Sequence, residues 1–187
     1  TVAIGKSALG ALTQGAGNTA VGFESQSTAQ DQGDFNTSVG YQALKVLDPS
    51  SDGDGDNTAL GYTAGAATTT GVKNTYVGSK AADGVVTGSA NTAVGFEALT
   101  SGNGDEDHNT CIGYKAGDVI DEGNNNTCIG SASDTGAATA TNQTAIGFEC
   151  TSVNVDNTIT LGNADVDGVY MNQNGQLGTG AIVYARG

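Results

Sequence analysis

The most constraining feature of this sequence is a short phrase, written most fully as NTAVGFE, which recurs about every 17 residues. Each copy is centred on one glycine of a series: Gly5, Gly22, Gly40, Gly61, Gly78, Gly95, Gly113, Gly130, Gly147 and Gly162. This period is too short for a helical-hairpin repeat and lacks the 3.6-residue spacing of a helix. It fits one coil of a β-solenoid, in which stacked coils share a core that no single coil can form.

Residues at equal distance from these glycines form columns, which we name by their content. The Asn, Thr, small and aliphatic columns stand four, three, two and one residues before the Gly column, and the aromatic column stands one after it. The aliphatic column is Ile4, Val21, Val39, Leu60, Val77, Val94, Ile112, Ile129, Ile146 and Leu161. The small column is Ala3, Ala20, Ser38, Ala59, Tyr76, Ala93, Cys111, Cys128, Ala145 and Thr160. The aromatic column holds Phe23, Tyr41, Tyr62, Phe96, Tyr114 and Phe148.

The columns predict how each coil is oriented. Alternate residues of a strand share a face, so we expect the aliphatic and aromatic columns to form the core, with the Thr column on their side. The small and Gly columns then face the other way, where small side chains let another backbone approach. The Asn column begins each strand, where Asn tolerates a left-handed turn and its amide can form a ladder with the next coil.

We therefore predict an all-β fold, a parallel β-roll or β-solenoid of about ten coils with two short strands and two turns in each. The repeat domain spans residues 1–162, and residues 163–187 form a cap or connector with strand-like segments at Gly168–Met171 and Ala181–Ala185. Leu, Ile, Val and Phe make up only about 18% of the chain and the net charge is −14, which normally favours disorder. The regular period outweighs that composition.

The segment Thr1–Ala8, TVAIGKSA, resembles the head repeat of trimeric autotransporter adhesins of the YadA type. The fuller form NTAVGFEAL is similar to repeats of bacteriophage tail-fibre proteins that carry the same kind of head. The resemblance covers residues 1–162 and implies a trimer of left-handed parallel β-rolls that works in attachment. The coils here are longer than in the adhesins, and the fourth position before the glycine, which varies there, is Asn in seven of the ten copies here.

Two further observations concern the parent protein. The segment Asn157–Asn163, NTITLGN, looks like the stretch that precedes a self-cleaving C-terminal chaperone domain in many phage fibres. That likeness implies that the chain is the upstream product of such a cleavage. The sequence also opens inside a copy of the repeated phrase, so we expect a segment of a longer protein.

Together these features predict a homotrimeric fibre segment, stalk or head, of a viral tail fibre or surface adhesin. We expect three rolls to pack through the Gly and small columns, which would hide apolar surface and strand edges. The expected location is extracellular, on a virion or cell-surface appendage, and the expected partner is a cell-surface glycan or protein receptor bound by the variable loops. The alternative is a purely structural spacer or extracellular filament with the binding site elsewhere.

Other classes are disfavoured. The six basic residues are scattered and cannot form a phosphate-binding stripe, which argues against nucleic acid. No apolar run reaches the length of about 18 residues that crosses a membrane. We expect no enzyme, because His108 is the only histidine and the repeated carboxylates Glu24, Glu97 and Glu149 lie in distant coils. A flat Thr array could bind ice, but the predicted inward orientation of the Thr column argues against this.

Two candidate sites stay open. Asp52, Asp54 and Asp56 have the alternation that opens a calcium loop, although Thr63 stands where an EF-hand needs Glu. They form either a looser calcium site or a solvated acidic insertion. Cys111 and Cys128 share the small column in adjacent coils, where strand spacing permits a disulfide, but we favour buried free thiols there and at Cys150.

Overall fold

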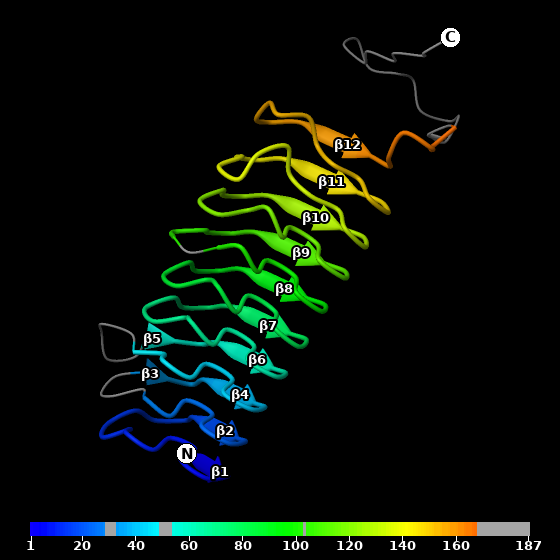
Figure 1. The fold of residues 1–187 in the computed structure, drawn as a ribbon. Coiled ribbons are helices and arrows are strands. Elements are labelled where there is room, and N and C mark those ends of the chain that lie inside the picture. The colour runs from blue at the N-terminus through cyan, green and yellow to red at the C-terminus, as the bar shows by residue number, and fades with distance from the viewer. Residues whose placement is uncertain (29–32, 49–53, 103, 168–187) are drawn as a thin grey trace, which may run out of the picture.

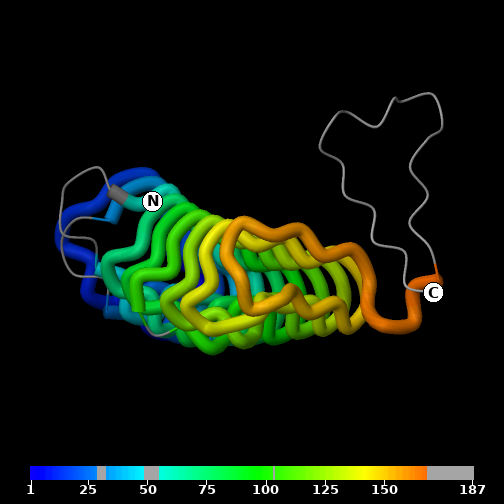
Figure 2. Tube along the Cα trace, turned by 90° about the horizontal axis from the view of Figure 1, so that it is seen from above, coloured from blue at the N-terminus to red at the C-terminus, as the bar shows by residue number. Residues whose placement is uncertain are grey.

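The computed structural model describes residues 1–28, 33–48, 54–102 and 104–167. These residues form a parallel β-solenoid of about nine turns of about 17 residues, with no helix in the described part. The coils stack into a rod (Figure 1), and a view from above shows successive coils that follow one another closely (Figure 2). The predicted fold class is confirmed. We number the coils 1 to 10 by the successive glycines of the Gly column.

Each coil contributes one three-residue strand to a ten-stranded parallel sheet. In sheet order the strands are β1 (Val2–Ile4), β2 (Thr19–Val21), β4 (Thr37–Val39), β6 (Thr58–Leu60), β7 (Thr75–Val77), β8 (Thr92–Val94), β9 (Thr110–Ile112), β10 (Thr127–Ile129), β11 (Thr144–Ile146) and β12 (Ile159–Leu161). Neighbouring strands pair in register, so that Ala93 of β8 lies beside Cys111 of β9. Every column of the sequence is thereby a straight row along the rod.

The prediction of two strands in every coil was wrong. Among the described residues, a second sheet exists only as β3 (Gly33–Asp34) paired with β5 (Asp54–Gly55). Elsewhere the remainder of the coil is built from turns that depend on residues with positive φ. For example, Glu97, Leu99 and His108 have φ angles of 52°, 55° and 59°. The left-handed residue is the one before each Asn of the Asn column rather than the Asn itself, as His108 before Asn109 illustrates.

The Gly column is explained by close contact between coils. Gly95 has a φ of +143°, and a Cβ atom built on it would overlap the carbonyl oxygen of Gly113 in the next coil. The same overlap would occur at the other glycines of this column from Gly5 to Gly130. The expected close approach of another backbone is therefore confirmed, but the backbone belongs to the following coil of the same chain.

The predicted orientation of the strands was wrong. The small column lies inside the rod, because its members from Ala20 to Ala145 are all fully buried. The aliphatic column faces outwards instead, with Leu60, Ile112 and Ile146 exposed by 48%, 39% and 40%. The interior enclosed by a 17-residue loop is narrow, so it accommodates Ala, Ser and Cys on the strand, and larger aliphatic side chains point away. The small column is consequently closed to a partner chain.

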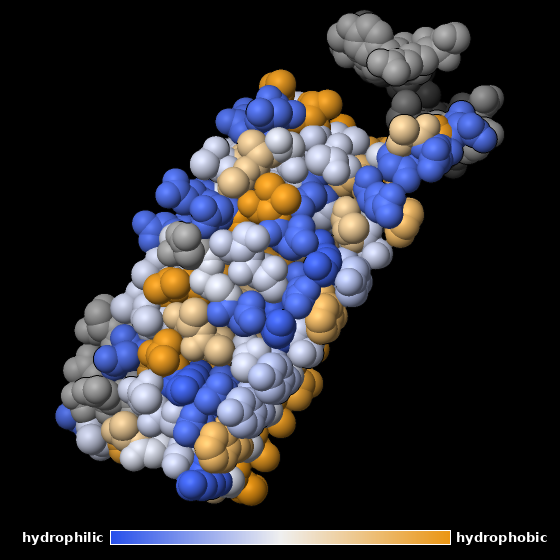
Figure 3. Space-filling model, in the orientation of Figure 1, coloured by the Kyte–Doolittle hydropathy of each residue, from blue (hydrophilic) through white to orange (hydrophobic). Residues whose placement is uncertain are grey.

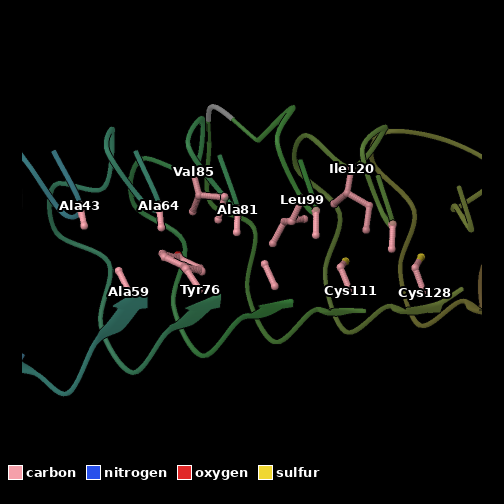
Figure 4. Close-up of a cluster of buried hydrophobic side chains, with 14 of the residues drawn as sticks. Ala43, Ala59, Ala64, Tyr76, Ala81, Val85, Leu99, Cys111, Ile120 and Cys128 are labelled. Atoms are coloured by element: carbon pink, nitrogen blue, oxygen red, sulfur yellow. The ribbon is translucent and has the colours of Figure 1, made fainter. Parts of the chain in front are cut away.

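The opposite wall of the interior comes from the turns that follow the Gly column. Val85, Leu99 and Ile120 are buried there against the strand residues, together with a row of alanines (Figure 4), and Leu44 is buried in the same cluster. Tyr76 is the only large residue in the small column. Its ring fits because Gly65 stands opposite, where an added Cβ would collide with the ring. The core is thus a thin double row of mostly small side chains.

The ladder predicted for the Asn column is confirmed. The Oδ1 atom of each Asn accepts the backbone N–H of its counterpart in the next coil, as in the 2.9 Å bond from Asn109 N to Asn91 Oδ1. The Nδ2 group donates to a backbone carbonyl inside the rod, for example from Asn109 to the carbonyl oxygen of Gly123 at 2.8 Å. The ladder runs from Asn18 to Gln143, and its members are almost fully buried.

A second ladder, which the sequence reasoning missed, runs in the opposite sense two residues earlier. Here the side chain of the later coil accepts the N–H of the earlier one. Asp107 Oδ1 accepts the N–H of Ser89 at 2.7 Å, and Asn124 Oδ1 accepts that of Asp107 at 2.6 Å. Some of the acidic side chains therefore act as hydrogen-bond acceptors for backbone N–H groups.

Replacing Asn91 by Ala should destabilise the rod strongly. The change leaves the buried N–H of Asn109 and the carbonyl of Glu106 without their partners. At about 1–3 kcal/mol for each buried group left unpaired, we expect a loss of about 2–5 kcal/mol in the free energy of unfolding. Denaturant titration followed by circular dichroism measures it. Asn154→Ala, at an exposed position, is the control, and equal stability of both variants would contradict a structural role for the ladder.

Candidate interaction surface

The outer face of the ten-stranded sheet carries a continuous apolar stripe. It consists of the aliphatic column and, beside it, the Thr column, since both point outwards from the same strands. Hydrophobic residues gather along the edge of the rod at which the strands end (Figure 3). With a strand spacing of about 4.8 Å, nine steps give the stripe a length of roughly 45 Å. Exposed apolar surface of this extent usually marks a contact site.

The aromatic column lies just beyond the strands, at the turn that follows each glycine. Phe23 stacks on Tyr41 and Tyr41 on Tyr62, with ring centroids 5.2 and 5.3 Å apart. Phe96 stacks on Tyr114 at 5.6 Å. The interplanar angles are only 8–12°, so the rings are stacked nearly parallel to one another along the rod. Their exposure contradicts the prediction that this column belongs to the core.

A row of charges follows the aromatic column. Glu97 lies between Lys80 and Lys115 of the adjacent coils, with N–O distances of 3.3 Å to each. Partial desolvation opposes the shift, but the hydrogen bonds from Lys115 and Lys80 lower the pKa of Glu97 overall. The carboxylate is therefore held between two cations.

The outward orientation removes the argument made against ice binding. The hydroxyl groups of the eight Thr-column residues from Thr19 to Thr144 have no hydrogen-bond partner among the described residues. Only one column of the stripe is Thr, however, and the neighbouring column is aliphatic. A surface that is half aliphatic suits contact with another protein better than an ordered water layer.

The calcium prediction remains untested. Asp52 lies outside the described residues, Asp54 belongs to β5, and Asp56 is exposed with a φ of 56°. Among the described residues, no group of three or more His, Cys, Asp or Glu side chains is arranged to hold a metal ion. His108 is exposed, and its backbone N–H donates a hydrogen bond to the carbonyl oxygen of Ser89. The strand-like segments predicted at Gly168–Met171 and Ala181–Ala185 also lie outside the described residues.

The cysteines are buried free thiols, as predicted. Cys111 and Cys128 are paired in register across β9 and β10. Contact with the Cys128 thiol, together with burial, raises the pKa of the Cys111 thiol. Both fill the interior as small buried side chains.

One buried carboxyl group stands out in the interior. Asp134 occupies the core position that Leu99 fills two coils earlier, and it is only 7% exposed. Its carboxylate oxygens accept the N–H groups of Val119 and Thr135 at 3.1 and 2.8 Å. Burial, together with the neighbouring carboxyl group of Asp118, raises the pKa of Asp134 to about 7. Repetition alone could not predict this group, because it breaks its column.

The contribution of Asp134 to the stability of the rod should therefore fall with rising pH. The pKa of Asp134 is higher in the folded chain than the usual value near 3.9, so the folded state binds the proton more tightly. This contribution is complete below about pH 4 and is lost as the pH rises through about 7. In Asp134→Asn the free energy of unfolding should fall less between pH 5 and pH 8.5. Denaturant titrations at both pH values measure it. The exposed Asp165→Asn should follow the unaltered chain, and equal slopes in all three proteins would contradict the assignment.

Comparison with protein-family models, with curated proteins and with solved structures gave no match for this chain. The described residues also contain no helix that could cross a membrane. The indications of function therefore come from the geometry of the rod and from its sequence.

Proposed function

We propose that this chain is a segment of a homotrimeric fibre, stalk or head, that presents or mediates attachment of a viral tail fibre or surface adhesin. Three rods would associate side by side through the stripe formed by the Thr and aliphatic columns. The proposed location is extracellular, on a virion or a cell-surface appendage. Sequence reasoning favoured the small column as the contact, and the stripe replaces it.

The observation that supports association is the unbroken row of outward aliphatic side chains. Every coil from Ile4 to Leu161 contributes one, and all of them lie in register along the sheet. A second rod carries the same row at the same spacing, so two rows can interdigitate along their whole length. Burying them removes apolar surface from water at about 25 cal/mol per Å².

A purely structural spacer, with the receptor site elsewhere in the fibre, is the second candidate. It is favoured by how fully the repeated polar groups are used within the rod. The Asn column pairs with backbone groups, and Glu97 is shared by Lys80 and Lys115. A fibre whose repeats only build the rod would have this character. Both candidates require the same lateral association.

Replacing Ile129 by Lys should weaken association without unfolding the rod. The residue is 36% exposed in the single chain, and association would bury the new ammonium group without a partner. Lys reduces the negative net charge, so added charge repulsion between chains cannot explain a loss. We expect the unaltered protein to have three times the chain mass at micromolar concentration and the variant to shift towards one. Sedimentation equilibrium measures the mass.

Val119→Lys is the matched control, because Val119 is 45% exposed but lies outside the stripe. It should assemble like the unaltered protein. A single-chain mass of about 18 kDa for the unaltered protein would contradict the proposal. The same holds if both lysine variants assemble equally well.

A further inference from the structure

The pile of aromatic rings is interrupted where Ser79 takes the place of a ring. Tyr62 lies one coil before this position and Phe96 one coil after it, and the register of β6, β7 and β8 places all three in one row. Ring stacking occurs on both sides of the interruption. No ring contact joins Tyr62 to Phe96 among the described residues.

The two rings that flank Ser79 present their free faces to each other. Tyr62 stacks on Tyr41 with one face, and Phe96 stacks on Tyr114 with one face. Their other faces therefore look along the rod towards the coil of Ser79. Both rings are accessible, with 52% of Tyr62 and 42% of Phe96 exposed.

By the spacing of the coils, Tyr62 and Phe96 stand far enough apart for one ring to lie between them. Two coil steps correspond to about 10 Å, and stacked rings elsewhere in the column are 5.2–5.6 Å apart. A flat six-membered ring placed above Ser79 would then lie about 5 Å from each neighbour, as the rings of the column already do. We call this opening the Ser79 gap.

Polar groups border the Ser79 gap on the floor and at one side. The hydroxyl group of Ser79 has no hydrogen-bond partner among the described residues. Lys80 follows it, and its side chain is 44% exposed and paired with Glu97 at 3.3 Å. A pyranose sugar has apolar C–H faces and a rim of hydroxyl groups, which matches two aromatic walls and a polar floor. A plain aromatic ring would leave the polar groups unused.

We propose that the Ser79 gap binds one pyranose ring of a glycan between Tyr62 and Phe96, with Ser79, Lys80 and Glu97 contacting its hydroxyl groups. The inference rests on the proposed attachment role and names its ligand class. It also moves the binding site from the variable loops, where sequence reasoning expected it, to an interruption in the repeat. Lateral association uses the stripe on the strands, so the gap and the stripe can be tested separately.

A second interruption provides an internal comparison. Ser131 takes the place of a ring between Tyr114 and Phe148, three coils further along, roughly 14 Å from the first gap. Its hydroxyl group also lacks a partner among the described residues. The position that corresponds to Lys80 is Ala132 here, so this gap has fewer groups for sugar hydroxyls. We expect it to bind the same ligands more weakly.

Saturation-transfer difference NMR with a set of methyl hexopyranosides tests the proposal on the assembled protein. The C–H protons on the sugar faces should receive saturation from the aromatic protons. Ser79→Tyr fills the gap with a ring and should reduce the transfer at least tenfold, and it should raise the melting temperature by completing the pile. Thr70→Tyr adds an exposed ring outside the column and should leave the transfer unchanged. Phe96→Leu removes one wall of the gap and should also reduce the saturation transfer. It therefore tests the site independently if Ser79→Tyr fails to fold.

The possible outcomes separate the claims. Absence of transfer to every pyranoside, or equal transfer in Ser79→Tyr, would overturn the sugar site. If phenol gives saturation transfer and no sugar does, the gap binds aromatic rings, and the proposed ligand class would be overturned. Ile129→Lys should dissociate the assembly and still bind sugar, so a failure of the fibre proposal is distinguishable from a failure of the glycan site.

Discussion

The spacing between coils is the constraint on which the whole rod depends. In-register strands stand about 4.8 Å apart, so each side chain meets a copy of itself in the coils on either side. A residue type can repeat from coil to coil if its side chain interacts favourably with an identical side chain in the next coil. Asn does so through the ladder that includes Asn91 and Asn109, and aromatic rings do so by stacking. Charges cannot, and the row therefore alternates Lys80, Glu97 and Lys115.

The same constraint decides how much could be predicted from the sequence. Column composition was enough to predict the stacked coils and the amide ladder, because both depend on what repeats. The facing of the strand was wrong because hydrophobicity was taken as the guide to burial. In a loop of 17 residues the width of the interior decides instead, so Ala93 and Cys111 lie inside while Val94 and Ile112 lie outside. Residues that break a column, such as Asp134, are visible in the sequence, but their burial is not.

The corrected facing changes which surfaces the rod presents to other molecules. With the small column inside, the sheet has no flat surface of Ala and Gly for a partner. It presents bulky aliphatic side chains and threonines, which a single rod leaves in water. A thin interior and an apolar exterior have one cause, since the turns opposite the strands fill the interior and leave room for mostly small side chains on the strands. The stability of a single rod and its tendency to associate are for this reason linked through the length of the coil.

Where a repeat has this degree of order, its exceptions are the places where specific chemistry can arise. A ring in every coil would leave the aromatic column with exposed edges only, because each face would be covered by the next ring. One serine uncovers two faces at once, one on Tyr62 and one on Phe96, at a separation fixed by the coils and not by flexible loops. Rigid walls lose little conformational entropy when a ligand binds, which favours binding by a small number of contacts. The regular columns thus supply the walls of the proposed site, and its opening comes from the single residue that departs from them.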